Sequence, residues 1–349
     1  MKNNTPSITS DPFAGMTLTG WYPGHMLKAT RQMQEVISLV DLVVELADAR
    51  APASSRNPEI RGYFPNKPFL LVANKTDLAD PAACRLWGKW FAEQGERAFF
   101  LDSRRIANIR GLTELWRRIV LETRAARGAT RPLNRPARIM IVGAPNVGKS
   151  TLVNHLHNRN QAKVGPKPGV TRHNQWIALD NDVELLDTPG ILWPRIRDKK
   201  HELLLTLLGI MKEDLILPTL VVEYFCWEIR RLENGAAVKW DTLGLAAPPA
   251  DGAELLKALA SRRGLLRPGG IPDLDRAAIA IIKDFRNARL GRLTFELPPK
   301  TANQPELGPP RQNPSTTPAA AGRVPEPNPD SNSNFDSDSN PGPGPEAGL

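Results

Sequence analysis

The sequence predicts an α/β domain with a mainly parallel sheet, followed by a small all-helical domain and a disordered tail. Short apolar runs alternate with helical spacing up to Asp187, whereas after Trp193 apolar residues recur at helical intervals. Beyond Pro298 the chain is rich in proline and has one aromatic residue, Phe335, so it has too few large apolar side chains to form a hydrophobic core. We expect a flexible N-terminus at 1–17, the α/β domain at 18–196, the helical domain at 197–298 and the tail at 299–349.

The individual elements follow from the spacing of the apolar residues. The predicted strands are Leu42–Leu46, Phe69–Ala73, Phe99–Leu101, Ile139–Val142, Trp176–Leu179 and Val183–Leu186. The predicted helices are Pro81–Gln94, Leu112–Arg127, one that begins at Lys149, and then Glu202–Leu208, Pro218–Leu232, Ala253–Arg263 and Leu274–Arg289. Strands and helices that alternate in this way are typical of a parallel sheet with helices on both faces.

Charge and cysteine content limit the partners and the compartment. The formal net charge is +9, although residues 301–349 hold six acidic and two basic side chains, so the folded part is strongly basic. Such a surplus favours a polyanion, either a nucleic acid or an anionic membrane surface. Cys84 and Cys226 both lie among apolar residues and are expected to be reduced and buried. Without an apolar run of about 20 residues, we expect a cytoplasmic protein that does not enter membranes.

A phosphate-binding loop is predicted at Gly143–Thr151, whose sequence is GAPNVGKST. It lies between an apolar run and a helix, which is the context this pattern requires. Lys149 would reach the β- and γ-phosphates, Ser150 would bind Mg²⁺, and the loop's N–H groups would surround the phosphates. The remaining nucleotide-binding candidates in this loop are Asn146, Val147, Gly148 and Thr151.

Two further motifs would sense the γ-phosphate. Asp187 and Gly190 form an Asp-x-x-Gly motif at the end of a predicted strand, where the aspartate would hold Mg²⁺ and the glycine N–H would meet the γ-phosphate. Thr171 lies between this motif and the phosphate loop, where its hydroxyl would bind Mg²⁺ only when γ-phosphate is present. Each motif is weak alone, and their position along the chain gives them weight.

The base is predicted to be guanine. Asn74-Lys75-Thr76-Asp77 follows a predicted strand, and Asp77 is suited to accept hydrogen bonds from the N1–H and N2–H₂ groups that adenine lacks. Asn74 and Lys75 would brace the base and the phosphate loop. Ser103 would place its N–H against the guanine oxygen, or it is an ordinary serine at a strand end. These residues predict GTP as the substrate.

The order of the motifs is unusual. In most GTPases the guanine-reading motif follows the Asp-x-x-Gly motif, whereas here it precedes the phosphate loop. The sequence therefore predicts a circularly permuted, Ras-like P-loop GTPase domain. The site survives permutation because it forms where the carboxyl ends of parallel strands meet. The loop after Asp187 then leads directly into the helical domain, to which it would transmit the nucleotide state.

The chain resembles the circularly permuted ribosome biogenesis GTPase A family over most of residues 18–298. The resemblance rests on the nucleotide motifs and on Trp21–Met26, Asp48–Pro52, Ser54–Pro58, Asp187–Pro194 and Gly291–Glu296. It implies a GTPase that binds a late precursor of the large ribosomal subunit through rRNA and leaves after hydrolysis. We expect a monomer away from the ribosome. The tail has no counterpart in the family core.

The residue that orients the attacking water is not supplied by the Asp-x-x-Gly loop, because Ile191 follows Gly190 and is apolar. The resemblance implies a catalytic histidine at His25, with His173 as a substitute, so the catalytic candidates are His25, Lys149 and Thr171. A structural or RNA-contacting role for His25 remains open. Asn146 stands where potassium-dependent GTPases use an asparagine, and it is expected to help bind K⁺ or to bond within its own loop.

The predicted helix Leu274–Arg289 carries an apolar stripe, and cations recur on its opposite flank: Arg276, Lys283, Arg286 and Arg289. Such a stripe is often only a solvated face. The basic surplus and the rRNA-binding domain implied by the resemblance favour contact with RNA phosphates. A GTP-dependent RNA-modifying enzyme is an alternative, but no second chemical site is evident after Trp193. A membrane-recruited signalling GTPase is another, but the chain has no lipidation motif.

Overall fold

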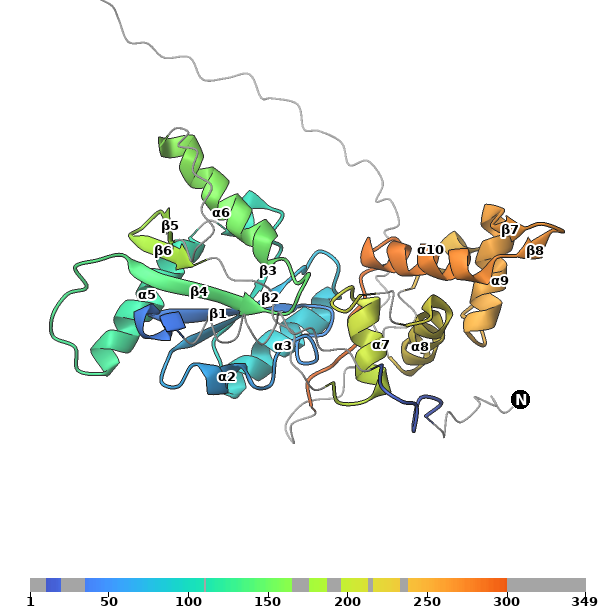
Figure 1. Ribbon diagram of the computed structural model, residues 1–349, viewed down its shortest axis with the longest axis horizontal. Helices are drawn as coiled ribbons and strands as arrows, with labels where there is room; N and C mark the ends of the chain where they lie inside the picture. The colour runs from blue at the N-terminus through green and yellow to red at the C-terminus, as the bar shows by residue number, and fades with distance from the viewer. Residues whose placement is uncertain are drawn as a thin grey trace, which may run out of the picture. The chain divides into compact units, whose positions relative to one another are not determined.

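The computed structural model describes residues 11–19, 35–109, 111–164, 176–186, 196–212, 216–232 and 238–299 (Figure 1). Met1–Pro299 is a single compact unit. The predicted disordered tail lies, apart from residue 299, outside the described residues. Within the described ranges, no helix has both the length and the apolar composition needed to cross a membrane.

A six-stranded sheet forms the centre of the α/β part, and all six predicted strands are present. Its strands are β1 (Leu42–Asp48), β2 (Phe69–Asn74), β3 (Ala98–Leu101), β4 (Ala137–Gly143), β5 (Trp176–Leu179) and β6 (Val183–Leu186). Their order is β3-β2-β1-β4-β6-β5, and every neighbouring pair is parallel except β5 and β6. Strands β2, β1 and β4 are adjacent, so the loops that follow them meet at one edge of the sheet.

Helices cover both faces of the sheet. One face packs against α5 (Leu112–Ala126) and α6 (Lys149–Val164), and the other packs against α2 (Ile60–Tyr63) and α3 (Pro81–Glu93). Strand β1 is buried along its whole length, and its side chains alternate: Val44 joins the α5 side, and Val43 joins the α2 side. This burial explains why the central strands read as continuous apolar runs. Two short helices, η1 (Ile37–Leu39) and α4 (Ile106–Ile109), complete this part.

The second part contains the four predicted helices and two elements that were not predicted, a short helix and a small hairpin. The helices are α7 (Lys199–Leu207), α8 (Pro218–Arg231), α9 (Gly252–Arg263) and α10 (Leu274–Arg286), with a short η4 at Trp240–Leu243. A small hairpin of β7 (Leu266–Arg267) and β8 (Ile271–Pro272) connects α9 and α10, so this predominantly helical part contains one short strand pair besides its helices. Its strands have two residues each, which is too short for an alternating pattern to show in the sequence.

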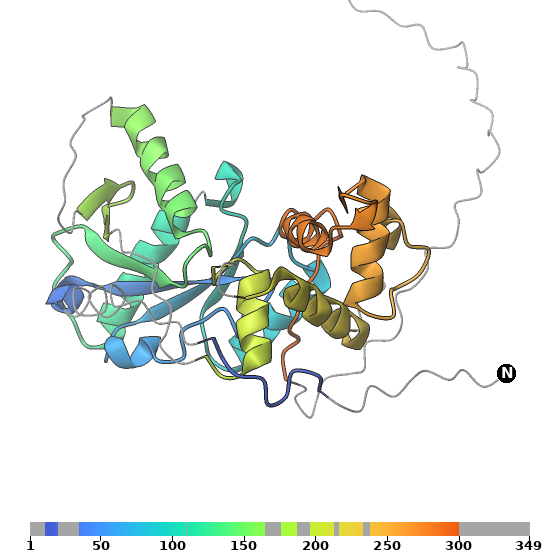
Figure 2. The ribbon, with the colours of Figure 1, turned by 45° about the vertical axis from the view of Figure 1, so that its right-hand side comes forward.

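The two parts share one hydrophobic core and are linked at both ends of the helical part. Figures 1 and 2 show α7 beside the ends of β1 and β4, where side chains of the α/β part donate hydrogen bonds to backbone carbonyls that follow α7. After α10 the chain returns to the α/β part, where the Leu293 N–H donates to Leu78 O at 3.2 Å and the Phe295 N–H donates to Arg50 O at 2.7 Å. The largest hydrophobic cluster runs from the α5 side of the sheet into α7–α10.

The described part of the N-terminal segment is packed, which differs from the flexible N-terminus expected at 1–17. Phe13 is buried and makes edge contacts with Tyr224 and Trp227 of α8, with ring centroids 5.7 and 5.5 Å apart. Lys200 of α7 forms an ion pair with Asp11 at 2.8 Å. The local sequence is polar and rich in turn residues, so it does not indicate a packed segment. Only the tertiary structure shows that the Phe13 side chain packs this segment against α8.

Candidate nucleotide-binding site

The phosphate loop connects β4 to α6 and has the backbone that the sequence predicts. Gly143 has φ 146°, and a Cβ there would lie 2.4 Å from Leu46 O on the neighbouring strand. Gly148 has φ 105°, and Asn146 has φ 58°. Positive φ angles at these positions turn the loop sharply, which is the geometry that directs N–H groups inward toward an anion.

Lys149 folds back over this loop. Its Nζ donates to Gly143 O at 3.0 Å and to Ala144 O at 2.7 Å, and the residue is 7% exposed. The ammonium group is therefore held at the loop by neutral carbonyl groups. An anionic phosphate would bind the ammonium group more strongly than these carbonyls do. Ser150 and Thr151 follow in the first turn of α6 and are both exposed. The Ser150 hydroxyl is thus an accessible hard oxygen of the kind that Mg²⁺ prefers.

Asn74, at the end of β2, links all three loops of the site. Its Nδ2 donates to Val147 O of the phosphate loop at 2.8 Å, and its Oδ1 accepts from the Ser103 N–H at 3.0 Å. Both Asn74 and Val147 are fully buried. A buried amide that uses both its donor and its acceptor has little freedom to rotate. Asn74 therefore fixes the loop Asn74–Asp77, called the base loop below, relative to the phosphate loop.

Lys75 and Asp77 are both engaged with charged neighbours. The Lys75 Nζ lies 3.0 Å from Asp48 Oδ2, and burial lowers the pKa of Lys75 while the Asp48 carboxylate opposes that shift. Asp77 forms an ion pair with Arg104, whose side chain is 63% exposed. The Asp77 side chain is 12% exposed, and Arg104 contacts only its Oδ2 atom, so the other carboxylate oxygen is not used in this ion pair.

Ser103 lies at the site, but its N–H does not face the space where a base would bind. That N–H donates to Asn74, and the next one, of Arg104, donates to Asp102 Oδ1 at 3.0 Å. Ser103 O lies 2.6 Å from His155 Nδ1. In this structure the loop after β3 is held by contacts with Asn74 of β2 and His155 of α6, so hydrogen bonding of Ser103 to guanine stays a prediction.

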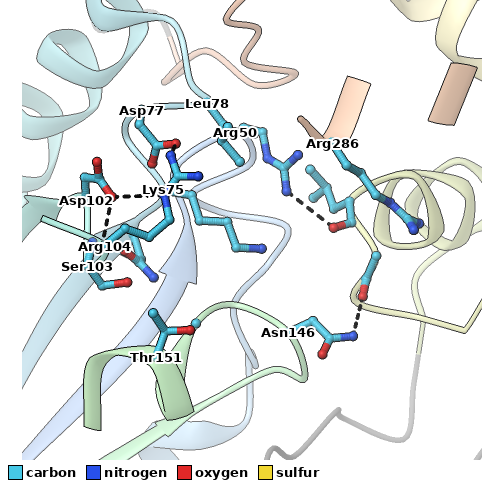
Figure 3. A pocket seen from close by; sticks show the side chains of 14 residues that line it. Arg50, Lys75, Asp77, Leu78, Asp102, Ser103, Arg104, Asn146, Thr151 and Arg286 are labelled. Atoms are coloured by element: carbon cyan, nitrogen blue, oxygen red, sulfur yellow. Dashed lines mark hydrogen bonds and ion pairs between the residues drawn. The ribbon is translucent and has the colours of Figure 1, made fainter. Parts of the chain in front are cut away.

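The loops enclose an open pocket of about 370 Å³, which is within the usual range for small-molecule sites. Figure 3 shows side chains from the base loop, the phosphate loop and the helical part around it. Six residues that line it were not predicted as site residues: Arg50, Leu78, Asp102, Arg104, Leu208 and Gly209. Only Arg50 carried a sequence signal, because it belongs to one of the motifs on which the family resemblance rests.

The helical part contacts the site through the turn after α7. Asn146 Nδ2 donates to Gly209 O at 2.7 Å, so the predicted K⁺ ligand bonds to the helical part and not within its own loop (Figure 3). Only the Nδ2 atom is used in this bond, which leaves the amide oxygen as the group that fits a cation. Five candidates lie outside the described residues: His25, Thr171, His173, Asp187 and Gly190.

Helix α10 has the predicted apolar stripe, since Ala277, Ile281 and Phe285 are among its buried residues. The predicted RNA-binding residues divide into two groups. Arg276, Lys283 and Arg289 are exposed, with Arg289 3.1 Å from Asp284.

Arg286 differs from the other three, because it turns inward and lines the nucleotide pocket. Its Nε donates to Leu207 O at 2.9 Å, and its Nη2 donates to Thr206 O. The cause is the end of α7, whose last carbonyls have no partners within the helix and attract a cation. The prediction that Arg286 shares the solvent flank of α10 was therefore wrong in its geometry.

Comparison with known proteins identifies the family of the chain. A family model described as 50S ribosome-binding GTPase matches residues 138–237. Ribosome biogenesis GTPase A of Bacillus pumilus is 40% identical over 80% of this chain and 98% of its own length. Mitochondrial ribosome-associated GTPase 1 of Xenopus tropicalis is 30% identical over 80% of this chain and 94% of its own length.

Solved structures give the same result. The GDP-bound structure of YlqF from Thermotoga maritima is 29% identical, covers 77% of this chain and 99% of its own, and superposes with a TM-score of 0.55. A second structure of that protein, bound to GNP, matches equally well, with a TM-score of 0.55. The site described above and these relatives, which match along almost their whole length, establish that the chain is a GTPase of the ribosome biogenesis GTPase A family.

Proposed function

We propose that this GTPase is a cytoplasmic assembly factor for the large ribosomal subunit, which binds rRNA in a subunit precursor in the GTP state and leaves after hydrolysis. The observation that carries the proposal is the contact between the phosphate loop and the helical part, from Asn146 Nδ2 to Gly209 O. A nucleotide that moves the phosphate loop would act on this contact directly. The names of the relatives supply the ribosome as the partner.

The nucleotide would be held by groups with separate tasks. Lys149 would leave the Gly143 and Ala144 carbonyls for the β- and γ-phosphates. Ser150 would bind Mg²⁺ together with Thr171 and Asp187, and the metal would supply charge neutralisation at the phosphates. The Gly190 N–H would donate a hydrogen bond to the γ-phosphate. The Asn146 oxygen would bind K⁺, whose positive charge would stabilise the negative charge on the phosphates during hydrolysis.

Hydrolysis is expected to depend on His25. His25→Ala should slow GTP hydrolysis by at least about 100-fold, which is the lower end for a side chain that handles the proton or orients the water. The affinities for GTP and GDP should stay nearly constant, because the histidine acts on water and not on the nucleotide. Single-turnover kinetics with and without large subunits measure both quantities. His157→Ala on α6 is the matched control and should hydrolyse GTP at the rate of the parent protein. If His25→Ala also hydrolyses GTP at that rate, His173 becomes the candidate for the catalytic histidine.

Binding to the large subunit tests the proposed function as a whole. The affinity for isolated large subunits should be higher with a non-hydrolysable GTP analogue than with GDP, and it should fall with salt. Replacing the exposed cations on α10 and just after it with alanine, at Arg276, Lys283 and Arg289, should lower the slope of log affinity against log salt by about 0.7–0.9 for each RNA phosphate that the variant no longer binds. Titrations at several salt concentrations with each nucleotide measure these effects.

The control for this experiment removes the same charge from the α/β part. Lys89, Arg97 and Arg118 are exposed, with side chains 66%, 49% and 63% exposed, so their triple alanine variant should leave the slope nearly unchanged. Equal affinity in both nucleotide states would contradict the switch. A nucleotide-dependent affinity with the parent's slope in the α10 variant would keep the switch and exclude α10 as the RNA-binding surface.

A further inference from the structure

The motif Asp48–Pro52 lies between the two nucleotide loops, and the task of its two buried charged residues is not explained by the groups proposed to bind the nucleotide. Asp48 is the last residue of β1, and its partner in the register is Asn74 of the base loop. On the other side of β1, Leu46 pairs with Gly143 of the phosphate loop. Asp48 and Arg50 are 0% and 1% exposed, so two opposite charges are fully buried at this point.

We propose that Asp48 and Arg50 are positioning residues that connect Lys75 of the base loop to the end of helix α7. Binding of guanine and the position of α7 would then depend on each other through one buried ion pair. This inference rests on the GTPase assignment, but it requires neither RNA nor a ribosome.

Asp48 is the shared centre of the arrangement. Its Oδ1 accepts from the Arg50 Nε at 2.9 Å and from the Arg50 N–H at 3.0 Å. Its Oδ2 accepts from the Arg50 Nη2 at 2.8 Å and lies 3.0 Å from the Lys75 Nζ. Burial alone would raise the pKa of Asp48, but the charges of Arg50 and Lys75 outweigh it and hold that pKa well below its usual value. The carboxylate is therefore ionised and fixes the ammonium group of Lys75.

Arg50 carries the connection to the helical part. Its Nη2 also donates to Leu208 O at 3.3 Å (Figure 3). Its guanidinium lies over the Phe285 ring of α10, 5.1 Å from the centroid. Its Nη1 is buried and has no hydrogen-bond partner among the described residues. A guanidinium with an unsatisfied buried nitrogen costs stability. The arrangement is thus better explained by the groups it positions than by a gain in stability.

The turn that Arg50 holds is also the point where the phosphate loop contacts α7. The carbonyls of three consecutive residues accept from three different elements: Leu207 O from Arg286, Leu208 O from Arg50 and Gly209 O from Asn146. The last carbonyls of a helix have no partners within it, so they are available for such contacts. One contact comes from the phosphate loop, and another leads through Asp48 to the base loop. The end of α7 is therefore tied to both halves of the nucleotide site.

The test uses the full chain, with Asp48→Asn, Arg50→Met and Arg50→Lys as variants. Hydrogen exchange measured by mass spectrometry follows the amides of residues 203–211 with and without GDP. In the parent protein, GDP should increase their protection. In Asp48→Asn and Arg50→Met this increase should disappear, and affinities for guanosine and GDP should fall by the same factor, about threefold to thirtyfold. Equal factors are expected because the pair acts on the base side and not on the phosphates.

Arg50→Lys separates positioning from charge. A lysine keeps the charge beside Asp48 but lacks the planar fork that reaches Leu208 O at the same time. This variant should keep guanosine affinity close to the parent's and still lose the GDP-dependent protection of α7. If Arg50→Met does not fold, Arg50→Lys decides the question alone.

Arg56→Met is the matched control. Arg56 forms an ion pair at 2.7 Å with buried Glu45 of β1, the strand that also carries Asp48, and it lies over the Phe91 ring. It does not line the nucleotide pocket. It should lower stability and leave GDP-dependent protection of α7 as in the parent. The proposal is overturned if GDP does not protect residues 203–211 in the parent, if Arg50→Met retains the effect, or if Arg56→Met loses it too. Failure to bind ribosomal subunits would affect only the proposed function.

Discussion

Gly148→Ala should abolish nucleotide binding at ordinary concentrations. Gly148 has φ 105°, and an added Cβ would lie 2.2 Å from Asn74 Nδ2. The substitution therefore strains the phosphate loop and displaces the side chain that fixes it to the base loop. Strain of about 3 kcal/mol at one such position corresponds to about 100-fold in affinity. Isothermal titration calorimetry with GDP and with a GTP analogue should show losses of at least this size.

Gly88→Ala is the control for the added methyl group. Gly88 lies within α3, where a Cβ would lie 3.6 Å from the nearest atom of the Phe100 ring, which is an ordinary contact. Nucleotide affinity should not change, and the protein should become more stable by up to about 1 kcal/mol, since alanine favours helix more than glycine. Retained nucleotide affinity in Gly148→Ala would show that the loop and Asn74 can move apart without loss of the site.

Asp77→Asn should change the base preference from guanine to xanthine. The carboxylate is suited to accept from the guanine N1–H and N2–H₂ groups, and an amide would present a donor to that amino group. Two charge-assisted hydrogen bonds of about 1.5–3 kcal/mol each predict GTP binding weaker by about 100-fold to 10,000-fold. Xanthosine triphosphate has an oxygen at that position and should bind the variant more tightly than GTP. Competition binding with both nucleotides measures the change.

Asp80→Asn controls for the loss of a carboxylate nearby. Asp80 is the N-cap of α3 and accepts from the Ala82 N–H at 2.9 Å, a role in which asparagine is nearly equivalent. Its variant should keep the parent's preference for GTP. If Asp77→Asn also keeps that preference, Asp77 does not read the base, and its ion pair with Arg104 is its main role.

The contacts of Arg286 show which side-chain positions helical spacing can predict and which it cannot. The spacing correctly placed the apolar residues of α10 in the core, because period 3.6 determines which side chains share a face. It could not show what lies beside the helix. The carbonyl end of α7 lies there, so a long side chain predicted to face RNA is hydrogen bonded to Thr206 and Leu207. Arg104 and Asp77 are a second case, since nothing in their spacing predicts an ion pair.

Local periodicity and glycines at strained positions were enough to predict the six strands, the four helices of the second part and the phosphate loop. The tertiary structure alone decided which groups those motifs contact. Asn146 reaches Gly209, 63 residues away, and Arg50 reaches Leu208, 158 residues away. Contacts over such separations arise when two packed parts bring side chains together, and no pattern within either segment encodes the partner in the other.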